Sequence, residues 1–277
     1  MIIGNQLTDK EFNLFSKLIY EQTGIFMKPE KKELLNARLG KRLRICGLPS
    51  FKNYYEYILS PEQQKIEFVN FLDSVSTNFT SFFRESSHFE FLANKILPEL
   101  ASKNRIKKEC FFWSSASSSG EEPYTLSMVL NDFARTRQGF TYKILATDIS
   151  TRVLGVAERG VYALSQTTKT PPEILRRYFQ KGKGSSVGMV RVKDEIKRAV
   201  QFKRFNLMHD FPWNEEMDVI FCRNVMIYFD RETQEKLVRK FYKCLARGGY
   251  LFIGHSESIS GIKHDFVQVE ATTYKKQ

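Results

Sequence analysis

The sequence of 277 residues contains no uncharged apolar run of about 18 residues, the length that a membrane-spanning helix requires. Near its start, Asp9, Lys10 and Glu11 follow too soon for the apolar core of a signal peptide. Both absences argue against a membrane protein and against export. We therefore expect a soluble, cytoplasmic protein with no segment inserted in a membrane.

Cysteine and histidine are scarce, with four of each, and no pair stands at the spacing of a metal knuckle or a redox motif. Three of the cysteines lie in apolar runs, so we expect buried free thiols. The sequence therefore predicts no metal site. These residues are Cys46, Cys110, Cys222 and Cys244, and His88, His209, His255 and His264.

Acidic residues are fewer than basic ones: the chain has 31 Asp and Glu and 43 Lys and Arg, which gives a formal net charge of +12. Much of the excess lies between residues 151 and 204, where thirteen basic residues accompany four acidic ones. A positive surface favours an acidic partner, such as nucleic acid, a membrane surface or an acidic protein. Hydrophobic residues make up 42% of the chain and aromatic residues 14%, which excludes an intrinsically disordered protein.

The segment 1–80 predicts a small all-helical N-terminal domain. Thr8 and Glu11 form a capping-box pattern, and Gly24 stands where a helix stop belongs. A second apolar stripe, Leu35–Leu43, belongs to a basic helix, which is either a solvated face or a site for an acidic partner. The basic residues of this helix are Lys31, Arg38, Lys41, Arg42 and Arg44.

From residue 81 to 277 short apolar strands alternate with helices, the pattern of a doubly wound α/β sheet. Asp230 is a helix cap, and Gly248-Gly249 is the expected stop of that helix. We expect strands at 110–113, 142–146, 217–222 and 250–253, helices at about 121–133, 150–158 and 230–248, and a closing antiparallel hairpin at 266–274.

Residues 160–205 interrupt the alternation. They contain Pro171-Pro172, three nearby glycines and short β-like runs at 189–192 and 200–205. We therefore expect an inserted small antiparallel β subdomain over 160–205 within the α/β domain.

The loop Ser114–Gly120 follows the first predicted strand, and ligands of open α/β sheets bind beyond such carboxyl ends. Its small side chains allow close approach to the backbone, and Asp148 after the next strand suits a ribose. Together they indicate an adenosine-containing ligand, although a serine-rich loop can also serve only as a turn. The G-x-G-x-x-G pattern and a P-loop lysine are absent, which disfavours NAD and nucleoside triphosphates.

Five strings resemble, in order and spacing, the chemotaxis receptor (methyl-accepting chemotaxis protein) methyltransferases. The strings are Thr77–Glu85, Gly120–Tyr124, Ala146–Ile149, Phe221–Asp230 and Gly254–Glu257. The likeness covers nearly the whole chain. The resemblance implies a Rossmann-like class I methyltransferase sheet with a helical N-terminal domain. One departure is Ala116-Ser117, where members often carry Gly and Cys.

The resemblance implies S-adenosyl-L-methionine as cofactor and S-adenosyl-L-homocysteine as product. The cofactor site that it implies consists of Asn78, Thr80, Arg84, Glu122, Asp148, Asn206, Leu207, Arg223 and Asn224. The chemistry agrees, because Asp148 suits the ribose hydroxyls, Glu122 the cationic amino group, and Asn206-Leu207 the adenine. The alternatives are local roles: Glu122 can complement a helix dipole, and Asn224 can be a turn residue.

The implied reaction is methyl transfer to glutamate carboxylates of chemoreceptors. A carboxylate is already ionised at pH 7, so catalysis needs alignment and exclusion of water but no general base. Arg84 is the candidate for orienting the substrate carboxylate, and Tyr228 is the second candidate catalytic residue. For Tyr228 a core aromatic role competes, and His255 is expected to be structural.

Two other functions compete with this interpretation. A nucleic-acid methyltransferase would agree with the net charge of +12, but it predicts basic residues interleaved with stacking aromatics. For amine targets it also predicts an Asn-Pro-Pro-Tyr-like string where this chain has Asn224–Ile227. A non-catalytic module that binds the cofactor and docks on receptors is the other alternative.

The resemblance also implies the partners of this protein, which are the cytoplasmic helical bundles of chemoreceptors. Nucleic acid is not expected as a partner. The basic helix with Arg38, Lys41, Arg42 and Arg44 is expected to steer these acidic bundles. In some members the inserted subdomain binds a receptor C-terminal tail, and the glycines 182, 184 and 188 resemble that type. Such tethering would recruit the cytoplasmic protein to receptor clusters.

Overall fold

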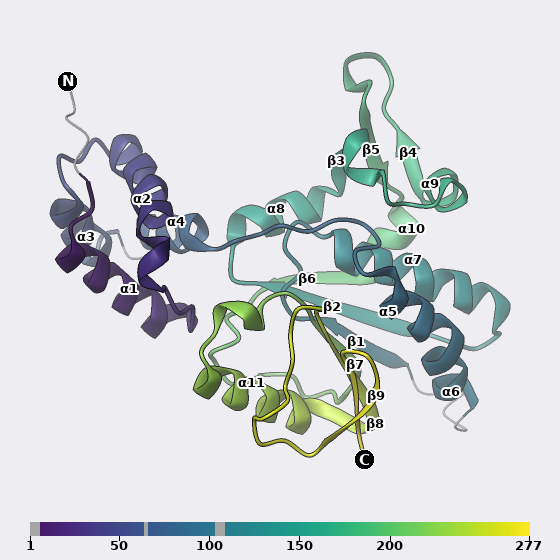
Figure 1. The fold of residues 1–277 in the computed structure, drawn as a ribbon. Helices are drawn as coiled ribbons and strands as arrows, with labels where there is room; N and C mark the ends of the chain where they lie inside the picture. Colours follow the sequence, from purple (N-terminus) through teal and green to yellow (C-terminus); the bar gives the residue numbers. More distant parts are fainter. Residues whose placement is uncertain (1–5, 64–65, 103–108) are drawn as a thin grey trace.

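The computed structural model describes residues 6–63, 66–102 and 109–277, and its N-terminal part is all helical (Figure 1). The helices are α1 Asp9–Thr23, α2 Lys32–Cys46, α3 Phe51–Leu59 and α4 Glu67–Val75, with a 3-10 turn η1 at Pro29–Lys31. Phe15, Tyr54 and Phe71 are buried together among them. The helical part therefore has an apolar core of its own.

Helix α1 begins and ends at the predicted residues. Glu11 N donates to Thr8 Oγ1 at 3.3 Å, and Thr8 N donates to the Glu11 carboxylate at 2.9 Å, which completes the capping box. Gly24 has a φ of 72°, and a Cβ there would lie 2.4 Å from Sδ of Met208. Glycine is required here for both conformation and space.

A seven-stranded sheet in the order β6-β2-β1-β7-β8-β10-β9 forms the centre of the remaining described chain. Its strands are β1 Cys110–Ser114, β2 Tyr142–Asp148, β6 Val200–Arg204, β7 Met217–Cys222, β8 Leu245–Ile253, β9 Phe266–Glu270 and β10 Thr273–Lys276. The first five in spatial order pair in parallel, and β10 runs antiparallel to β8 and β9. The predicted Rossmann-like sheet with its closing hairpin is confirmed.

Helices cover both faces of this sheet (Figure 1). They are α5 Ser86–Phe91, the π-helical η2 Leu92–Ile96, α6 Leu97–Ser102, α7 Glu121–Thr136, α8 Thr151–Arg159 and α11 Arg231–Cys244. In β1, Phe112 packs in one core with Tyr124 of α7, while Trp113 packs in a second core with Phe241 of α11. Successive side chains of a strand point to opposite faces, so β1 supplies both cores.

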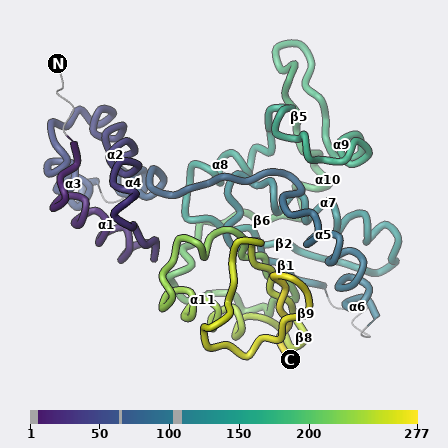
Figure 2. Tube along the Cα trace, viewed as in Figure 1, coloured from purple at the N-terminus to yellow at the C-terminus, as the bar shows by residue number. Residues whose placement is uncertain are grey.

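A small antiparallel sheet, β3-β5-β4, projects from the α/β part beside α9 and α10 (Figures 1 and 2). Its strands are β3 Val161–Ala163, β4 Phe179–Lys181 and β5 Met189–Val192, and the helices are α9 Pro172–Tyr178 and α10 Asp194–Lys197. An inserted antiparallel β unit is therefore present. The run 200–205, expected inside it, instead forms β6 and pairs in parallel with β2 of the central sheet. The domain limits 1–80, 81–277 and 160–205 stay predictions.

Helix α11 begins after Asp230 as predicted, but it ends at Cys244, before the expected stop at Gly248-Gly249. These glycines belong to the first half of β8. A Cβ on Gly249 would lie 2.9 Å from the carbonyl oxygen of Ala246 and 3.0 Å from that of Asp218. The glycine thus permits close backbone approach to β7, where the register shifts.

None of the described helices has the length and apolar character that crossing a membrane requires.

Candidate active site

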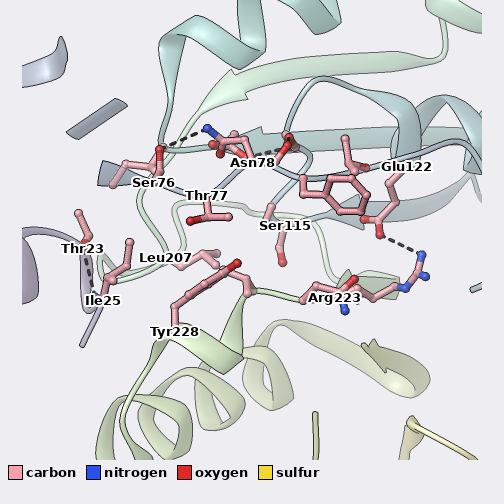
Figure 3. Close-up of a pocket in the computed structure, with 18 of the residues that line it drawn as sticks. Thr23, Ile25, Ser76, Thr77, Asn78, Ser115, Glu122, Leu207, Arg223 and Tyr228 are labelled. Carbon is pink, nitrogen blue, oxygen red and sulfur yellow. Dashed lines mark hydrogen bonds and ion pairs between the residues drawn. The ribbon is translucent and has the colours of Figure 1, made fainter. Parts of the chain in front are cut away.

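A pocket lies where β1, β2 and β7 end, and every candidate site residue from the sequence lines it (Figure 3). These residues are Asn78, Thr80, Arg84, Glu122, Asp148, Asn206, Leu207, Arg223, Asn224 and Tyr228. Thr23 and Ile25 reach the pocket from the helical N-terminal part, and Ser115 and Ser118 reach it from the loop after β1. The pocket thus collects segments between Thr23 and Phe229, at the sheet edge where α/β folds bind ligands.

Asp148 at the end of β2 organises the first loop. Its carboxylate accepts hydrogen bonds from Ser118 N at 2.8 Å and Ser150 N at 2.9 Å. Burial raises the pKa of Asp148 above its ordinary value, although these two amides favour its charged form. Ser118 adopts a φ of 48°, which turns the loop around the carboxylate. Asp148 therefore shapes the pocket and also faces it.

Glu122 and Arg223 form a buried ion pair beside the pocket (Figure 3). Nη1 of Arg223 lies 3.1 Å from Oε2 of Glu122, whose Oε1 accepts a hydrogen bond from Ser114 Oγ at 2.7 Å. Burial raises the pKa of the Glu122 carboxyl, against the lowering effect of the Arg223 charge. The Arg223 side chain is only 1% exposed and packs over the ring of Phe89. Arg223 is thus fixed by protein groups and holds Glu122 in place.

Arg84 has a more open position than Arg223. Its Nη1 donates to the carbonyl oxygen of Phe79 at 3.0 Å, and its guanidinium lies over the Phe79 ring. The side chain of Arg84 is 29% exposed, and its Nε is 4.0 Å from Oε1 of Glu85. That separation is the limit of an ion pair, so the charge of Arg84 is available to a ligand carboxylate.

Tyr228 joins the helical N-terminal part to the pocket. Its carbonyl oxygen accepts a hydrogen bond from Phe26 N at 2.8 Å, and the ammonium of Lys31 lies 5.2 Å from its ring centre. Ile25 and Phe229 form an isolated antiparallel bridge next to it. Figure 3 shows the Tyr228 side chain extending into the pocket from the turn that follows β7.

The other predicted site residues line the pocket, and some of them also form hydrogen bonds with neighbouring segments. Asn206 Nδ2 donates to the carbonyl oxygen of Gln22 at 2.6 Å, and its Oδ1 accepts from Met208 N at 3.0 Å. One N–H of the Asn206 amide therefore joins α1 to the segment after β6, and Leu207 adds an apolar wall to the pocket. The carbonyl oxygen of Asn78 accepts from Ser118 Oγ at 2.8 Å. Thr80 lines the pocket from the same segment as Asn78.

Comparison with known proteins gives a consistent result over nearly the full chain. The family described as "CheR methyltransferase, SAM binding domain" matches residues 78–275, and "CheR methyltransferase, all-alpha domain" matches residues 10–73. The chain belongs to the CheR methyltransferase family. The resemblance identified from the five strings is confirmed.

Curated relatives agree with this assignment. A "Chemotaxis protein methyltransferase" of Borreliella burgdorferi is 42% identical, covering 98% of this chain and 95% of the relative. The protein of the same name from Escherichia coli is 39% identical over 97% of this chain and 91% of the relative. "Chemotaxis protein methyltransferase 2" of Pseudomonas aeruginosa is 36% identical over 99% and 96% of the two chains. The chain is therefore an S-adenosylmethionine-dependent methyltransferase of the chemotaxis class.

The pocket has the chemical groups that S-adenosylmethionine requires. Two carboxylates, Asp148 and Glu122, face it and can meet ribose hydroxyls and a cationic amino group. Ile149, Phe205 and Leu207 add apolar walls suited to adenine. The loop after β1 carries only small side chains, so a ligand can lie against its backbone.

Sequence reasoning missed two carboxylates that hold this pocket together. Glu257 accepts hydrogen bonds from the backbone N–H groups of Gly254, Asn224 and Ile227, at 2.6, 2.9 and 3.2 Å. Glu85 accepts from Asn224 Nδ2 at 3.2 Å and from Arg223 Nη2 at 3.0 Å. Both residues lie in strings that carried the resemblance. A signal was therefore present, but their roles depend on contacts between distant segments.

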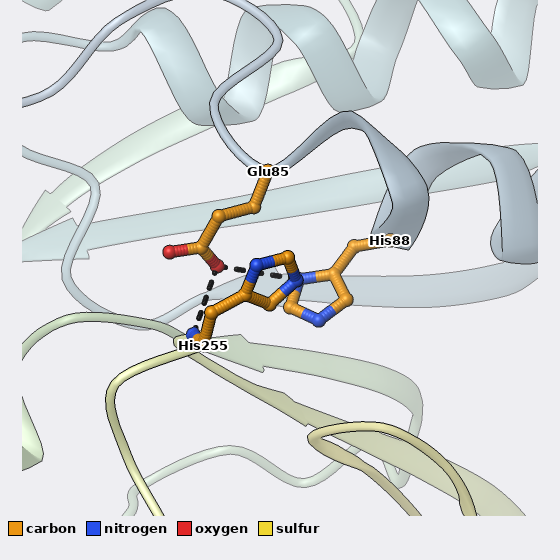
Figure 4. Close-up of side chains that lie close together, drawn as sticks. All are labelled: Glu85, His88 and His255. Carbon is orange, nitrogen blue, oxygen red and sulfur yellow. Dashed lines mark hydrogen bonds and ion pairs between the residues drawn. The ribbon is translucent and has the colours of Figure 1, made fainter.

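Glu85, His88 and His255 lie close together outside the pocket (Figure 4). Nδ1 of His88 is 3.6 Å from Oε2 of Glu85, and burial together with the Arg223 charge lowers the pKa of His88 to about 3. The same Oε2 already accepts from Arg223 Nη2 and from His255 N at 3.2 Å. Because Arg223 neutralises this carboxylate, the cluster is better suited to positioning α5 against β8 than to binding a cation.

Proposed function

We propose that this enzyme transfers the methyl group of S-adenosyl-L-methionine to glutamate side-chain carboxylates in the cytoplasmic helical bundles of chemoreceptors. The glutamate methyl esters formed would serve chemotactic adaptation. The observation that carries the proposal is Arg84, a partly exposed cation that lines the pocket and that has, among the described residues, only a weak ion pair with Glu85 at 4.0 Å. Such a cation can meet a ligand carboxylate, and both the glutamate substrate and the methionine part of the cofactor carry one.

We assign separate roles in the reaction to Arg84, to Tyr228 and to the carboxylates of Asp148 and Glu122. The bound cofactor supplies an electrophilic methyl group on a sulfonium. Arg84 orients the substrate carboxylate, which needs no general base because it is ionised at pH 7. Tyr228 donates its hydroxyl near the reacting groups and, with Ile25 and Phe229 packed next to it, keeps water away. We assign Asp148 to the ribose and Glu122 to the amino group of the cofactor.

The direct test combines purified enzyme, radiolabelled methyl donor and receptor cytoplasmic fragments. We expect label in the receptor that mild base releases as methanol, the behaviour of a methyl ester. The Arg84→Ala variant is the control for transfer at this pocket. Label in added nucleic acid would favour the nucleic-acid alternative, and cofactor binding without any transfer would favour the non-catalytic module.

Tethering by the receptor tail is a separate part of the proposal. β3 and β4 are the edge strands of the small sheet, and an extended tail could add to either of them. The glycines resembling the tail-binding type are needed by the loop itself: Gly184 and Gly188 have positive φ, and a Cβ on Gly182 would lie 2.0 Å from Ser186 O. Support for the tail therefore comes from the edge positions of β3 and β4 and from the family, although Ala163 N of β3 already donates to Oε1 of Gln166. Fragments with and without the tail should differ in affinity, and recruitment to receptor clusters should follow the tail.

The basic helix α2 is proposed to steer the receptor bundle, but the structure changes which of its residues can do so. Arg42 is paired with the buried carboxylate of Glu67, with donor–acceptor distances of 2.9 and 2.5 Å. Arg38 donates to the carbonyl oxygen of Val75 at 2.5 Å, which fixes its side chain but leaves its positive charge in place. Lys41 and Arg44 are exposed, so they are the better steering residues.

A further inference from the structure

A second concavity lies between the helical N-terminal part and α8. It has a volume of about 940 Å³ and is lined by residues of α2, α4 and α8. Ser76, Thr77 and Asn78 line both this groove and the cofactor pocket. Figures 1 and 2 show this segment running from α4 past α8 toward α5. The groove therefore leads directly to the active site.

The α2 wall of the groove is positively charged. The Arg38 guanidinium donates to neutral acceptors, the carbonyl oxygen of Val75 and Oγ1 of Thr77, so no carboxylate of the described segments compensates its charge. Lys41 is exposed and has no acidic partner among the described residues. Ile45, with 59% of its surface exposed, adds an apolar contact on the same wall.

The α8 wall adds a charge on the other side. Arg152 is exposed in the first turn of α8, and its side chain has no acidic partner in the described part of the chain. Asp73 of α4 is the one carboxylate among the described lining residues. It accepts from Thr151 N and Arg152 N, both at 3.1 Å, and from Thr151 Oγ1 at 3.0 Å. Asp73 is therefore occupied in fixing α8 against α4, and the groove keeps an uncompensated positive charge.

We infer that this groove is a two-walled docking site for an acidic receptor helix, with Arg152 of α8 facing the cations of α2. The inference rests on the proposed function and adds to it the second wall. A helix with its side chains is about 10–12 Å across, so glutamates on its two flanks can meet cations on opposite walls. A methylatable glutamate further along the same helix then reaches Asn78 and Arg84 through the shared segment.

Charge reversals on the two walls test the groove. Arg152→Glu is compatible with folding, because only the backbone N–H of Arg152 is bonded to Asp73 and a carboxylate suits the start of a helix. Lys41→Glu probes the α2 wall. Lys263→Glu is the matched control, since Lys263 is exposed and belongs to the segment that joins β8 to β9, a segment that Figure 1 shows apart from α2 and α8.

The measurement is the initial rate of methylation at low salt over a range of receptor-fragment concentrations. We expect each groove variant to raise the KM for the fragment roughly tenfold. The kcat and the calorimetric Kd for S-adenosyl-L-homocysteine should change less than about twofold, and so should every constant of Lys263→Glu.

Three results would overturn the two-walled groove. One is an unchanged KM for Arg152→Glu beside a raised KM for Lys41→Glu, which would place the receptor on α2 alone. Another is an equal rise for Lys263→Glu, which would reduce the effect to net charge. The third is weakened cofactor binding in Arg152→Glu, which would show a disturbed pocket. If the wild-type enzyme methylates no receptor fragment, the proposed function itself is wrong, and the docking role of the groove is then wrong as well.

Discussion

Nη2 of Arg223 lies 3.0 Å from Oε2 of Glu85, although the two residues are 138 positions apart in the sequence. The other terminal nitrogen of the same guanidinium contacts Glu122, and Nη2 also donates to the carbonyl oxygen of Arg84. Burial is the largest single effect on Glu85 and opposes its ionisation, but the Arg223 charge together with hydrogen bonds from Arg223 and Asn224 lowers the pKa of that carboxyl. One buried cation thus sets the position of the segment that carries Arg84.

Removing this cation should strongly destabilise the protein. We expect Arg223→Ala to lower the free energy of unfolding by about 3–5 kcal/mol, because it leaves two buried carboxylates without their partner. Arg239→Ala, which breaks an exposed ion pair with Glu235, is the control and should cost at most about 1 kcal/mol. Urea denaturation measures both. Similar losses in the two variants would show that the buried network is not needed.

Asp148→Ala should weaken binding of S-adenosyl-L-homocysteine on the order of 10- to 100-fold, since a charged hydrogen-bond acceptor is lost. Titration calorimetry on folded protein is the measurement. Asp148→Asn keeps the size and one acceptor oxygen, so its loss should be smaller. Wild-type affinity in a folded Asp148→Ala variant would remove the ribose assignment.

Arg84→Ala should reduce the rate of methyl transfer on the order of 100-fold, the usual scale for losing one charged group that positions the reacting atoms. Its stability should fall by less than about 1 kcal/mol, since the side chain is partly exposed and its nearest carboxylate is distant. Arg84→Lys should also be impaired, because an ammonium lacks the planar fork. Circular dichroism and steady-state rates separate the outcomes, and an unfolded Arg84→Ala protein would make Arg84 structural.

Glu257→Gln should loosen the loop that carries Asn224 and Tyr228. The amide places an NH2 group where the carboxylate accepted hydrogen bonds from backbone N–H groups. We expect the loss of these charge-assisted hydrogen bonds to cost about 1.5–3 kcal/mol of stability. Native-state hydrogen exchange should accelerate at the amides of Asn224 and Ile227 more than in β1. Unchanged protection at these two amides would show that Glu257 does not hold the loop.

His88 should make the protein sensitive to mild acid. Its pKa is about 3 when folded and near 6.5 when unfolded, so its contribution is fully present above pH 6.5 and declines as the pH falls. Between pH 6.5 and pH 5 we expect a loss of about 2 kcal/mol from this residue. His88→Gln keeps a donor toward Thr272 and should flatten the stability profile over this range. A variant profile parallel to the wild type would contradict the assignment.

Features governed by neighbouring residues could be predicted from the sequence. Thr8 with Glu11 and Asp230 mark helix starts correctly, because a cap bonds to backbone amides within the next turn. The strands after residue 109 follow from apolar runs, which must be covered on both faces. Every candidate site residue taken from the family resemblance lines one pocket, because these residues lie in the segment before α5 or at and after the carboxyl ends of β1, β2, β6 and β7.

The two errors share a physical cause. Val200–Arg204 was predicted as a strand, but a strand pattern does not say which sheet its edge will join. Gly248-Gly249 resembled a helix stop, yet Gly249 is required because the chain there passes close to Asp218 of β7. In both cases the deciding contact is with a residue far away in the chain.

The sequence by itself determined the fold class, the family and ten of the residues that line the pocket, because these depend on local patterns and on ordered strings. Only the tertiary structure decided which charges are used internally and which remain free. Arg42 is paired with Glu67 and Arg223 with Glu85 and Glu122, whereas the side chain of Arg84 is partly exposed and lies 4.0 Å from the Glu85 carboxylate. The reason is that burial and pairing of a charge depend on which distant segments surround it, and no spacing along the chain encodes that.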